Sequence, residues 1–332
     1  MTGNTLGWVI VAFVLYLLMM IAIGAFYAKG NNNSEDYFLG GRKLNGFVAA
    51  LSAQASDMSG WLLMGLPGAI YLTGVGGDGW IAIGLFIGTT LNWLFIATKL
   101  RRYTIRANNS VTLPTYFENR FHDEKKVLMA VSSITIVVFF LVYCASALSA
   151  GGQLFESVFG IDYHVALTIG ALVVLVYTFL GGFTAVCVTD FIQGMLMLVG
   201  ILAVPLFAYH FLTTGGTTLS AGLEASGADS ANFLNLMKNG DGSNNIISVI
   251  SGLGWGLGYF GMPHILVRFM AVRDEKEMTK SKATAISWVA LSLGFAVFIG
   301  ILGRAYLPEL VNGNNEKVFI EMIKKVFTVE LR

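Results

Sequence analysis

Eight apolar runs, each close to the ~20 residues that cross the hydrocarbon core of a bilayer, follow one another along this 332-residue chain. They lie at residues 6–27, 46–72, 79–98, 127–150, 162–181, 189–212, 246–267 and 284–303. Within lipid a chain must pair its backbone polar groups internally, which leaves helices or a closed barrel. No strand-like alternation accompanies the runs. The sequence therefore predicts an all-α integral membrane protein in the lipid bilayer.

Composition argues against other classes. Charged residues make up 12% of the chain, whereas a soluble globular protein has about 25%. The net charge of +1 gives no reason to expect nucleic-acid binding. Cys144 and Cys187 lie in or beside apolar runs, and the four histidines are scattered, so we expect neither a disulfide nor a transition-metal site.

Lysine and arginine alternate between the two sides of the predicted membrane. The loops after the first, third and seventh runs are rich in them, whereas the loops after the second and fourth have none. Since cytoplasmic loops carry the excess of these residues, loops 28–45, 99–126 and 268–283 should face the cytoplasm. The N-terminus should then lie outside.

The second run contains an interruption, SAQASDMSGWLLMGLPG at 52–68. Asp57 stands near its middle, where an unpaired carboxylate costs roughly 2.5–3.5 kcal/mol on insertion scales. Gly60 and Pro67 weaken a continuous helix at the same place. Irregular backbone at this depth is tolerated where it lines a cavity, so this stretch predicts a broken helix at a binding site.

A second interruption, SGLGWGLGYFGMPHILVRF, occupies 251–269 in the seventh run. Close helix packing through Gly254 and Gly258 is one interpretation, because they form a small-xxx-small pair. Packing alone does not call for Trp255 and Tyr259 on one turn, so we favour a second broken helix that forms a cavity wall.

Two broken helices five runs apart predict an inverted repeat with a binding site near the membrane midplane. We expect residues 1–45 to form an extra helix and loop, 46–212 the first repeat, and 246–303 the start of a second repeat. Residues 304–332, with an amphipathic segment at 318–331, should be external or interfacial. The second repeat then looks incomplete, so we expect residues 1–332 alone to be inactive.

Longer stretches carry a family resemblance. They are DYFLGGRKL (36–44), ALSAQASDMSGWLLMGLPGAIYLTG (50–74), LPTYFENRF (113–121), YCASALSAGGQLFE (143–156), YTFLGGFTAVCVTDFIQ (177–193) and GWGLGYFGMPHILVRFMA (254–271). Together they resemble the sodium:solute symporter family over essentially the whole chain. The resemblance implies the inverted-repeat fold of the leucine transporter with one extra N-terminal helix. It also implies Na⁺-driven uptake of L-proline through a bacterial cell membrane, with no enzymatic activity and no cofactor beyond the coupling ion.

The resemblance also implies roles for individual residues. Carbonyl groups of Ala55 and Met58, with Asp57 nearby, would bind sodium. Arg42 and Asp190 match positions linked to sodium dependence. Met262 departs from the family pattern, which has glutamine there. Substrate contacts would come from Ser59, Gly60, Trp61, Tyr143, Trp255, Tyr259 and Pro263.

Several alternatives stay open at this point. Asp190 would also serve as an ordinary helix N-cap, and the positive-inside rule accounts for Arg42 without a special role. A symporter for another small solute, such as pantothenate or a sugar, fits the same pattern. So does a transporter-like solute sensor that feeds a cytoplasmic kinase.

Overall fold

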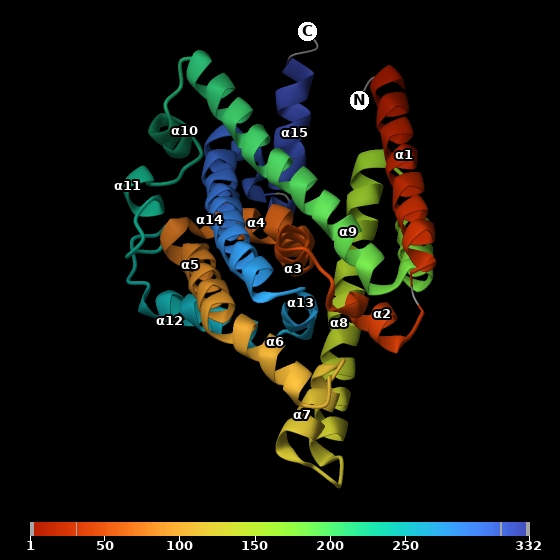
Figure 1. Cartoon of the computed structure of the whole chain (residues 1–332). Coiled ribbons are helices and arrows are strands. Elements are labelled where there is room, and N and C mark those ends of the chain that lie inside the picture. Colours follow the sequence, from red (N-terminus) through yellow and green to blue (C-terminus); the bar gives the residue numbers. More distant parts are fainter. Residues whose placement is uncertain (1–2, 31, 313, 330–332) are drawn as a thin grey trace. The chain divides into compact units, whose positions relative to one another are not determined.

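The computed structural model describes residues 3–30, 32–312 and 314–329, and it is built from helices joined by short connections (Figure 1). Extended pairing within these residues is limited to isolated bridges. The N-terminal half contains α1 (Gly3–Ala28), α2 (Ser34–Leu39), η1 (Gly40–Arg42), α3 (Gly46–Gly60), η2 (Trp61–Gly65), α4 (Leu66–Thr73), α5 (Val75–Leu91), η3 (Asn92–Ile96), α6 (Ala97–Arg106), α7 (Leu113–Phe121) and α8 (Val127–Phe159). The remainder contains α9 (Tyr163–Thr214), α10 (Leu219–Ala225), α11 (Ser230–Phe233), α12 (Ile246–Trp255), η4 (Gly256–Gly261), α13 (Pro263–Ala271), α14 (Glu275–Tyr306), η5 (Pro308–Asn312), η6 (Asn315–Lys317) and α15 (Val318–Val329).

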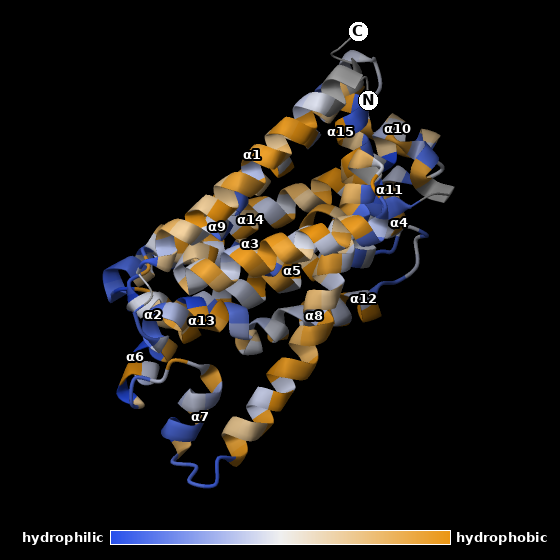
Figure 2. Cartoon of the chain, turned by 90° about the vertical axis from the view of Figure 1, so that its right-hand side faces the viewer, coloured by the Kyte–Doolittle hydropathy of each residue, from blue (hydrophilic) through white to orange (hydrophobic). Residues whose placement is uncertain are grey.

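Five helices within the described residues are long and apolar enough to cross a membrane. They are Gly7–Ala28, Val75–Arg106, Val127–Glu156, Tyr163–Thr214 and Glu275–Tyr306. The pair Ile246–Gly261 and Pro263–Ala271 passes the same test together and is bent by 46°. Figure 2 shows the apolar character of α1 and α8 and the hydrophilic loop between α7 and α8.

The fifth and sixth predicted runs form one 52-residue helix, α9, that changes direction at a single residue. Gly182 has φ 62° and ψ −159° there, a conformation that only glycine adopts without strain. The helical segment after the break therefore begins before Asp190, which lies well inside it. The N-cap interpretation of Asp190 is wrong, because no separate helix begins at that residue.

The chain divides into two compact units, each described below by itself. Unit 1 comprises residues 1–56, 97–193 and 263–281. Unit 2 comprises residues 57–96, 194–262 and 282–332. The chain passes from one unit to the other close to both predicted interruptions, after Ser56 and after Met262.

In unit 2, α5 packs directly against α12 (Figure 1). A Cβ atom on Gly84 would lie 2.2 Å from the carbonyl oxygen of Gly252, and one on Gly88 would lie 2.2 Å from that of Gly256. The small-xxx-small contact is therefore made by Gly252 and Gly256. The sequence interpretation assigned it to Gly254 and Gly258, whose Cβ positions meet nothing within 4 Å in the described part of the chain.

The C-terminal part of unit 2 covers α4. Tyr71 on α4 donates a 2.7 Å hydrogen bond to the carbonyl oxygen of Leu307, and Asn315 donates one of 3.0 Å to that of Gly68. The predicted amphipathic segment 318–331 corresponds to α15, whose Met322 and Val326 are fully buried. Residues 330 and 331 lie outside the described residues.

Candidate functional site

The first predicted interruption is a real break at the end of α3. Ser59 has φ 40° and ψ −158°, which a residue with a side chain adopts only under strain. The next residues, Trp61–Gly65, form a π-helical turn before α4 begins. Such a break frees backbone carbonyl and N–H groups from the regular helical ladder. Ala55, Asp57 and Met58, the predicted sodium residues, lie in the last turns before it.

In unit 2, Asp57 meets the second interrupted helix. The hydroxyl of Tyr259 donates a 2.5 Å hydrogen bond to Asp57 Oδ2. Tyr259 belongs to η4 and is 2% exposed, and its own carbonyl oxygen accepts a 2.8 Å hydrogen bond from the Asn92 side chain. Asn92 opens the π-helical turn η3 and is fully buried. The Asp57 carboxylate therefore has a partner on the helix that the sequence paired with it.

Trp61 and Trp255 form an aromatic wall in the same unit. Their rings stack with centroids 5.9 Å apart and an interplanar angle of 20°. Trp61 begins the π-helical turn after the first break, and Trp255 ends α12 just before η4. Stacked indoles present a flat apolar surface whose π faces also attract cations.

The predicted residues Tyr143 and Pro263 lie in unit 1. Tyr143 of α8 donates a 2.9 Å hydrogen bond to the carbonyl oxygen of Ser56, which belongs to the last turns of α3. Its ring stacks on His264 at 5.6 Å between centroids. Pro263 is the first residue of α13, where its missing N–H costs nothing.

A buried ion pair in unit 1 joins three helices. Arg268 of α13 and Asp190 of α9 are 2.9 Å apart, with side chains only 6% and 11% exposed. The hydroxyls of Ser52 and Ser56, both on α3, donate to Asp190 at 2.7 and 2.9 Å. The Arg268 guanidinium donates to the same hydroxyl oxygens at 3.0 and 2.8 Å. The cluster satisfies both charges away from water, as a buried pair requires.

Sequence reasoning assigned no individual site role to Arg268, Ser52, Ser56 or Asn92. It placed Arg268 in a cytoplasmic loop, whereas the structure places it in α13 with 5% of its surface exposed. A usable signal existed, because an acidic residue such as Asp190 in an apolar helix calls for a cationic partner. Asn92 offered no comparable signal, since a single amide in an apolar run has many explanations.

Arg42 is buried in unit 1 and fixes several chain segments. Its guanidinium donates to the carbonyl oxygens of Met270 at 2.8 Å and Ser110 at 2.9 Å, and to the side chain of Asn109 at 2.9 Å. Burial lowers the pKa of Arg42 below its usual value, and the Glu35 carboxylate 3.6 Å away opposes that change. Arg42 is therefore more than a surface charge on a cytoplasmic loop.

A cavity of about 840 Å³ opens within unit 1. Most of its lining is apolar, and Arg268 and His264 are its polar exceptions beside several hydroxyl side chains. Pro263, Phe140 and Phe183 contribute to its wall. The Arg268 guanidinium lies 5.6 Å from the centre of the Phe183 ring, so the aromatic wall also stabilises the charge.

The structure thus groups the predicted residues into two sets. Asp57, Trp61, Trp255 and Tyr259 are joined by contacts in unit 2, with Ser59 and Gly60 at the break between Asp57 and Trp61. Tyr143 and Asp190 each contact α3 in unit 1, and Pro263 begins the helix that carries Arg268. Sodium and substrate binding by these residues stays a prediction.

Comparisons with known proteins give a consistent picture. A sequence profile described as "Sodium:solute symporter family" matches residues 37–332. Sodium/proline symporters of Salmonella typhimurium and Escherichia coli are each 44% identical over 324 residues, which cover 96% of this chain and 63% of theirs. A sodium/proline symporter of Haemophilus influenzae is 45% identical over 326 residues. The chain therefore spans less than two thirds of the length of these relatives, at 63%.

The fold resembles a solved structure, the substrate-bound, outward-open state of a Na⁺-coupled sialic acid symporter. The TM-score is 0.71, with 94% of this chain and 68% of that chain covered, at 19% sequence identity. A likeness at this identity shows the fold alone. It confirms the expected all-α transporter fold of the leucine-transporter type, and the apolar helices make this a multi-pass membrane protein.

Proposed function

Because the chain belongs to the sodium:solute symporter family, we propose that it serves Na⁺-coupled uptake of L-proline by alternating access. The protein moves its substrate across the membrane and does not convert it chemically. Its location is a bacterial cell membrane, with the N-terminus outside and the arginine-rich loops in the cytoplasm. The named function of the 42–45% identical relatives supports the choice of proline.

One observation carries this proposal: the two interrupted helices share the Asp57–Tyr259 hydrogen bond beside the Trp61–Trp255 stack. Proline is a zwitterion with a small apolar ring, so it needs donors for its carboxylate, acceptors for its ammonium group and an apolar wall. Freed helix ends at Ser59 and Gly60 supply the polar groups. The stacked rings of Trp61 and Trp255 supply the apolar wall.

Sodium binds at the carbonyl oxygens of Ala55 and Met58, next to the negative charge of Asp57. Na⁺ is a hard cation that prefers oxygen ligands, and the carbonyls at the end of a half-helix carry the negative end of its dipole. Tyr259 links this site to the second interrupted helix, since its hydroxyl donates a hydrogen bond to the Asp57 carboxylate. Arg42 and Asp190 help to couple Na⁺ binding to uptake, because Arg42 fixes the backbone at Met270 and Asp190 fixes α3 through Ser52 and Ser56.

The test replaces Asp57 in the protein. Asp57→Ala should raise the Na⁺ concentration that gives half-maximal proline uptake at least tenfold, equivalent to about 1.4 kcal/mol. Two unit charges 4 Å apart interact by about 4 kcal/mol at an effective dielectric constant of 20, so tenfold is a lower limit. Asp57→Glu should keep part of the sodium dependence, because it keeps the charge.

The measurement is Na⁺-driven accumulation of labelled proline in proteoliposomes. Asp241→Ala serves as the matched control, because Asp241 is an exposed carboxylate in the segment between α11 and α12. An unchanged half-maximal Na⁺ concentration in Asp57→Ala would refute the role of Asp57. Na⁺-driven accumulation of labelled pantothenate or of a labelled sugar, without accumulation of labelled proline, would assign the protein to another solute.

A further inference from the structure

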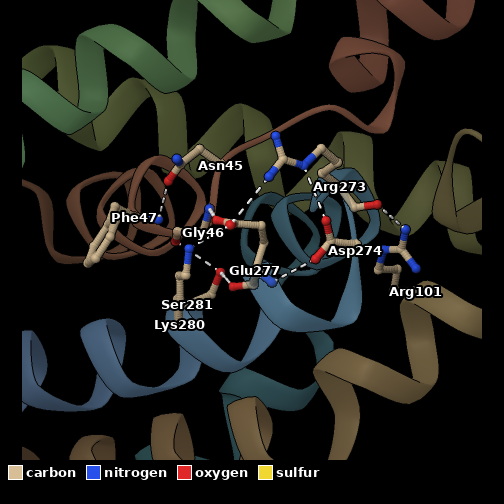
Figure 3. A network of polar contacts seen from close by, with 9 residues as sticks. All are labelled: Asn45, Gly46, Phe47, Arg101, Arg273, Asp274, Glu277, Lys280 and Ser281. Carbon is tan, nitrogen blue, oxygen red and sulfur yellow. Dashed lines mark hydrogen bonds and ion pairs between the residues drawn. The ribbon is translucent and has the colours of Figure 1, made fainter.

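The N-terminal end of α3 is held by the start of α14, although the two are far apart in sequence (Figure 3). The backbone N–H of Gly46 donates a 2.7 Å hydrogen bond to Glu277 Oε2, across 231 positions of the chain. In return, the Ser281 hydroxyl donates a 2.9 Å hydrogen bond to the Gly46 carbonyl oxygen. Only 4% of the Glu277 side chain is exposed.

This contact acts as a helix cap supplied by another helix. The first N–H groups of a helix have no partner within it, and a residue just before the helix usually provides one. Here Asn45 provides an acceptor for the Phe47 N–H at 2.8 Å, and Glu277 provides the acceptor for Gly46. A carboxylate is favoured at this end, because the helix dipole places partial positive charge there.

Gly46 permits an unusually close approach. A Cβ atom at this position would lie 2.4 Å from the carbonyl oxygen of Glu277 and 3.1 Å from Cβ of Lys280. The backbones of α3 and α14 are therefore in direct contact, so a shift of one helix end displaces the other.

A short bridge adds a second attachment next to the cap. The Leu44 N–H donates to the Ala271 carbonyl oxygen at 3.1 Å, and the Arg273 N–H donates to the Leu44 carbonyl oxygen at 3.0 Å. Arg101 of α6 also donates to the Val272 carbonyl oxygen at 2.6 Å. We call the segment Leu44–Phe47 together with Ala271–Ser281 the α3 clamp.

The charge of Glu277 is balanced inside the clamp. Lys280 Nζ lies 2.8 Å from Glu277 Oε1, and Arg273 lies 3.4 Å from the same atom. The Glu277 N–H in turn donates to Asp274 at 2.8 Å, which orders the first turn of α14. The carboxylate can therefore stay charged while nearly buried, as a cap for α3 requires.

We infer that Glu277 is a positioning residue that makes the first half of α3 (46–56) move together with α13 and the start of α14 during transport. The inference rests on the proposed function, because α3 leads directly to the sodium residues Ala55 and Met58. If α3 could leave the clamp alone, only a fraction of molecules would present an assembled site. The apparent affinity for Na⁺ would then fall by that fraction.

A cross-link across the clamp tests this directly. Asn45 and Arg273 flank the bridged pair of Leu44 and Val272, and both are exposed. Asn45→Cys and Arg273→Cys would be combined in a background lacking Cys144 and Cys187, and joined by a short bifunctional thiol reagent. Segments that move together tolerate the cross-link, so the joined protein should keep at least half of the uptake rate of the unjoined protein. Loss of uptake upon joining would overturn the inference.

Substitution of Glu277 gives a second readout. Glu277→Gln should raise the Na⁺ concentration that gives half-maximal uptake at least threefold. The cross-link should return this concentration to within twofold of its value in the protein with Glu277 intact. Glu275→Gln is the matched control, because Glu275 is 54% exposed and pairs with Arg102 on the surface. Equal behaviour of the two variants would contradict the role of Glu277.

A third measurement does not depend on transport. A nitroxide spin label is attached to a cysteine introduced by Phe47→Cys, and its electron paramagnetic resonance spectrum is recorded. The fraction of mobile label should be at least threefold larger in Glu277→Gln than in Glu275→Gln. If the protein without the cross-link shows no sodium-driven proline uptake, the proposed function is wrong. The spectrum still tests whether Glu277 holds α3 in the clamp, because it does not depend on transport. An unchanged spectrum in Glu277→Gln would overturn the clamp even if uptake is normal.

Discussion

Breaking the Arg268–Asp190 pair should strongly destabilise unit 1. Arg268→Ala leaves the Asp190 carboxylate with two serine hydroxyls and no cation, while only 11% of its side chain is exposed. Asp190→Ala leaves the Arg268 guanidinium with the two serines and the His264 carbonyl oxygen. Removing one partner of a buried pair costs about 3–5 kcal/mol, because the other charge is left uncompensated.

The expected change in unfolding temperature follows from this cost. One kcal/mol shifts the midpoint by roughly 2–4 °C in a domain of about 150–250 residues. At the lower end of that range, each single variant should lose about 6–10 °C. The double variant Asp190→Ala/Arg268→Ala leaves no unpaired charge, so its loss should be smaller than the sum of the two single losses.

The assay uses Cys187, which is fully buried, as a reporter of unfolding in a background without Cys144. A fluorogenic thiol reagent would follow its exposure as the purified protein is heated in detergent. Arg102→Ala is the control, because its contact with Glu275 is even shorter, at 2.6 Å, but the two side chains are 52% and 54% exposed. Its midpoint should stay within experimental scatter, since water already solvates both charges. Additive losses in the double variant, or single losses no larger than the control, would refute the reasoning.

Three further predictions concern packing, topology and pH. Gly84→Val should destabilise the protein by about 1–3 kcal/mol or more, because its side chain would collide with the Gly252 carbonyl, whereas Gly254→Val should be tolerated in thermal unfolding. Among single cysteines placed at Asn32, Asn108 and Ser230, a membrane-impermeant thiol reagent applied from outside should label only the one at Ser230. Labelling at Asn108 would show that the predicted orientation is wrong. The hydrogen bond from the Glu277 N–H holds the pKa of Asp274 below its usual value. Charged Asp274 therefore stabilises the folded protein above the unfolded-state pKa of about 3.9, and this stabilisation is lost as the pH falls through the lower pKa of the folded state. The difference in unfolding temperature between the parent and Asp274→Ala should therefore shrink between pH 7 and pH 3, and a constant difference would contradict the capping role.

The positions of the interruptions could be read from local sequence. Asp57, Gly60 and Pro67 indicated a broken helix because each conflicts with a continuous helix in lipid, and the break falls at Ser59. The glycine-rich stretch around Trp255 and Tyr259 indicated the second break in the same way, and η4 replaces the regular helix there. Backbone preference and the cost of a buried charge act within a few residues, so they leave a local signature.

Partners could not be read in the same way. One interpretation of Asp190 from the sequence was that it caps a helix. In the structure its carboxylate pairs instead with Arg268, which lies 78 positions away in the chain. The alternative interpretation of the second interruption, close packing, named Gly254 and Gly258, although Gly252 and Gly256 face α5. Small-xxx-small spacing is identical for both pairs, so only the rotation of α12 about its axis distinguishes them.

The sequence by itself determined that this chain is a helical membrane protein interrupted at two places, because hydrophobic length and helix-breaking residues act through local physics. Tertiary structure alone decided that Tyr259 bonds Asp57, that Arg268 neutralises Asp190, and that Glu277 caps Gly46. Each of these contacts joins residues separated by at least 78 positions. Their formation depends on how whole helices are rotated and shifted against one another, which the residue pattern of either helix does not encode alone.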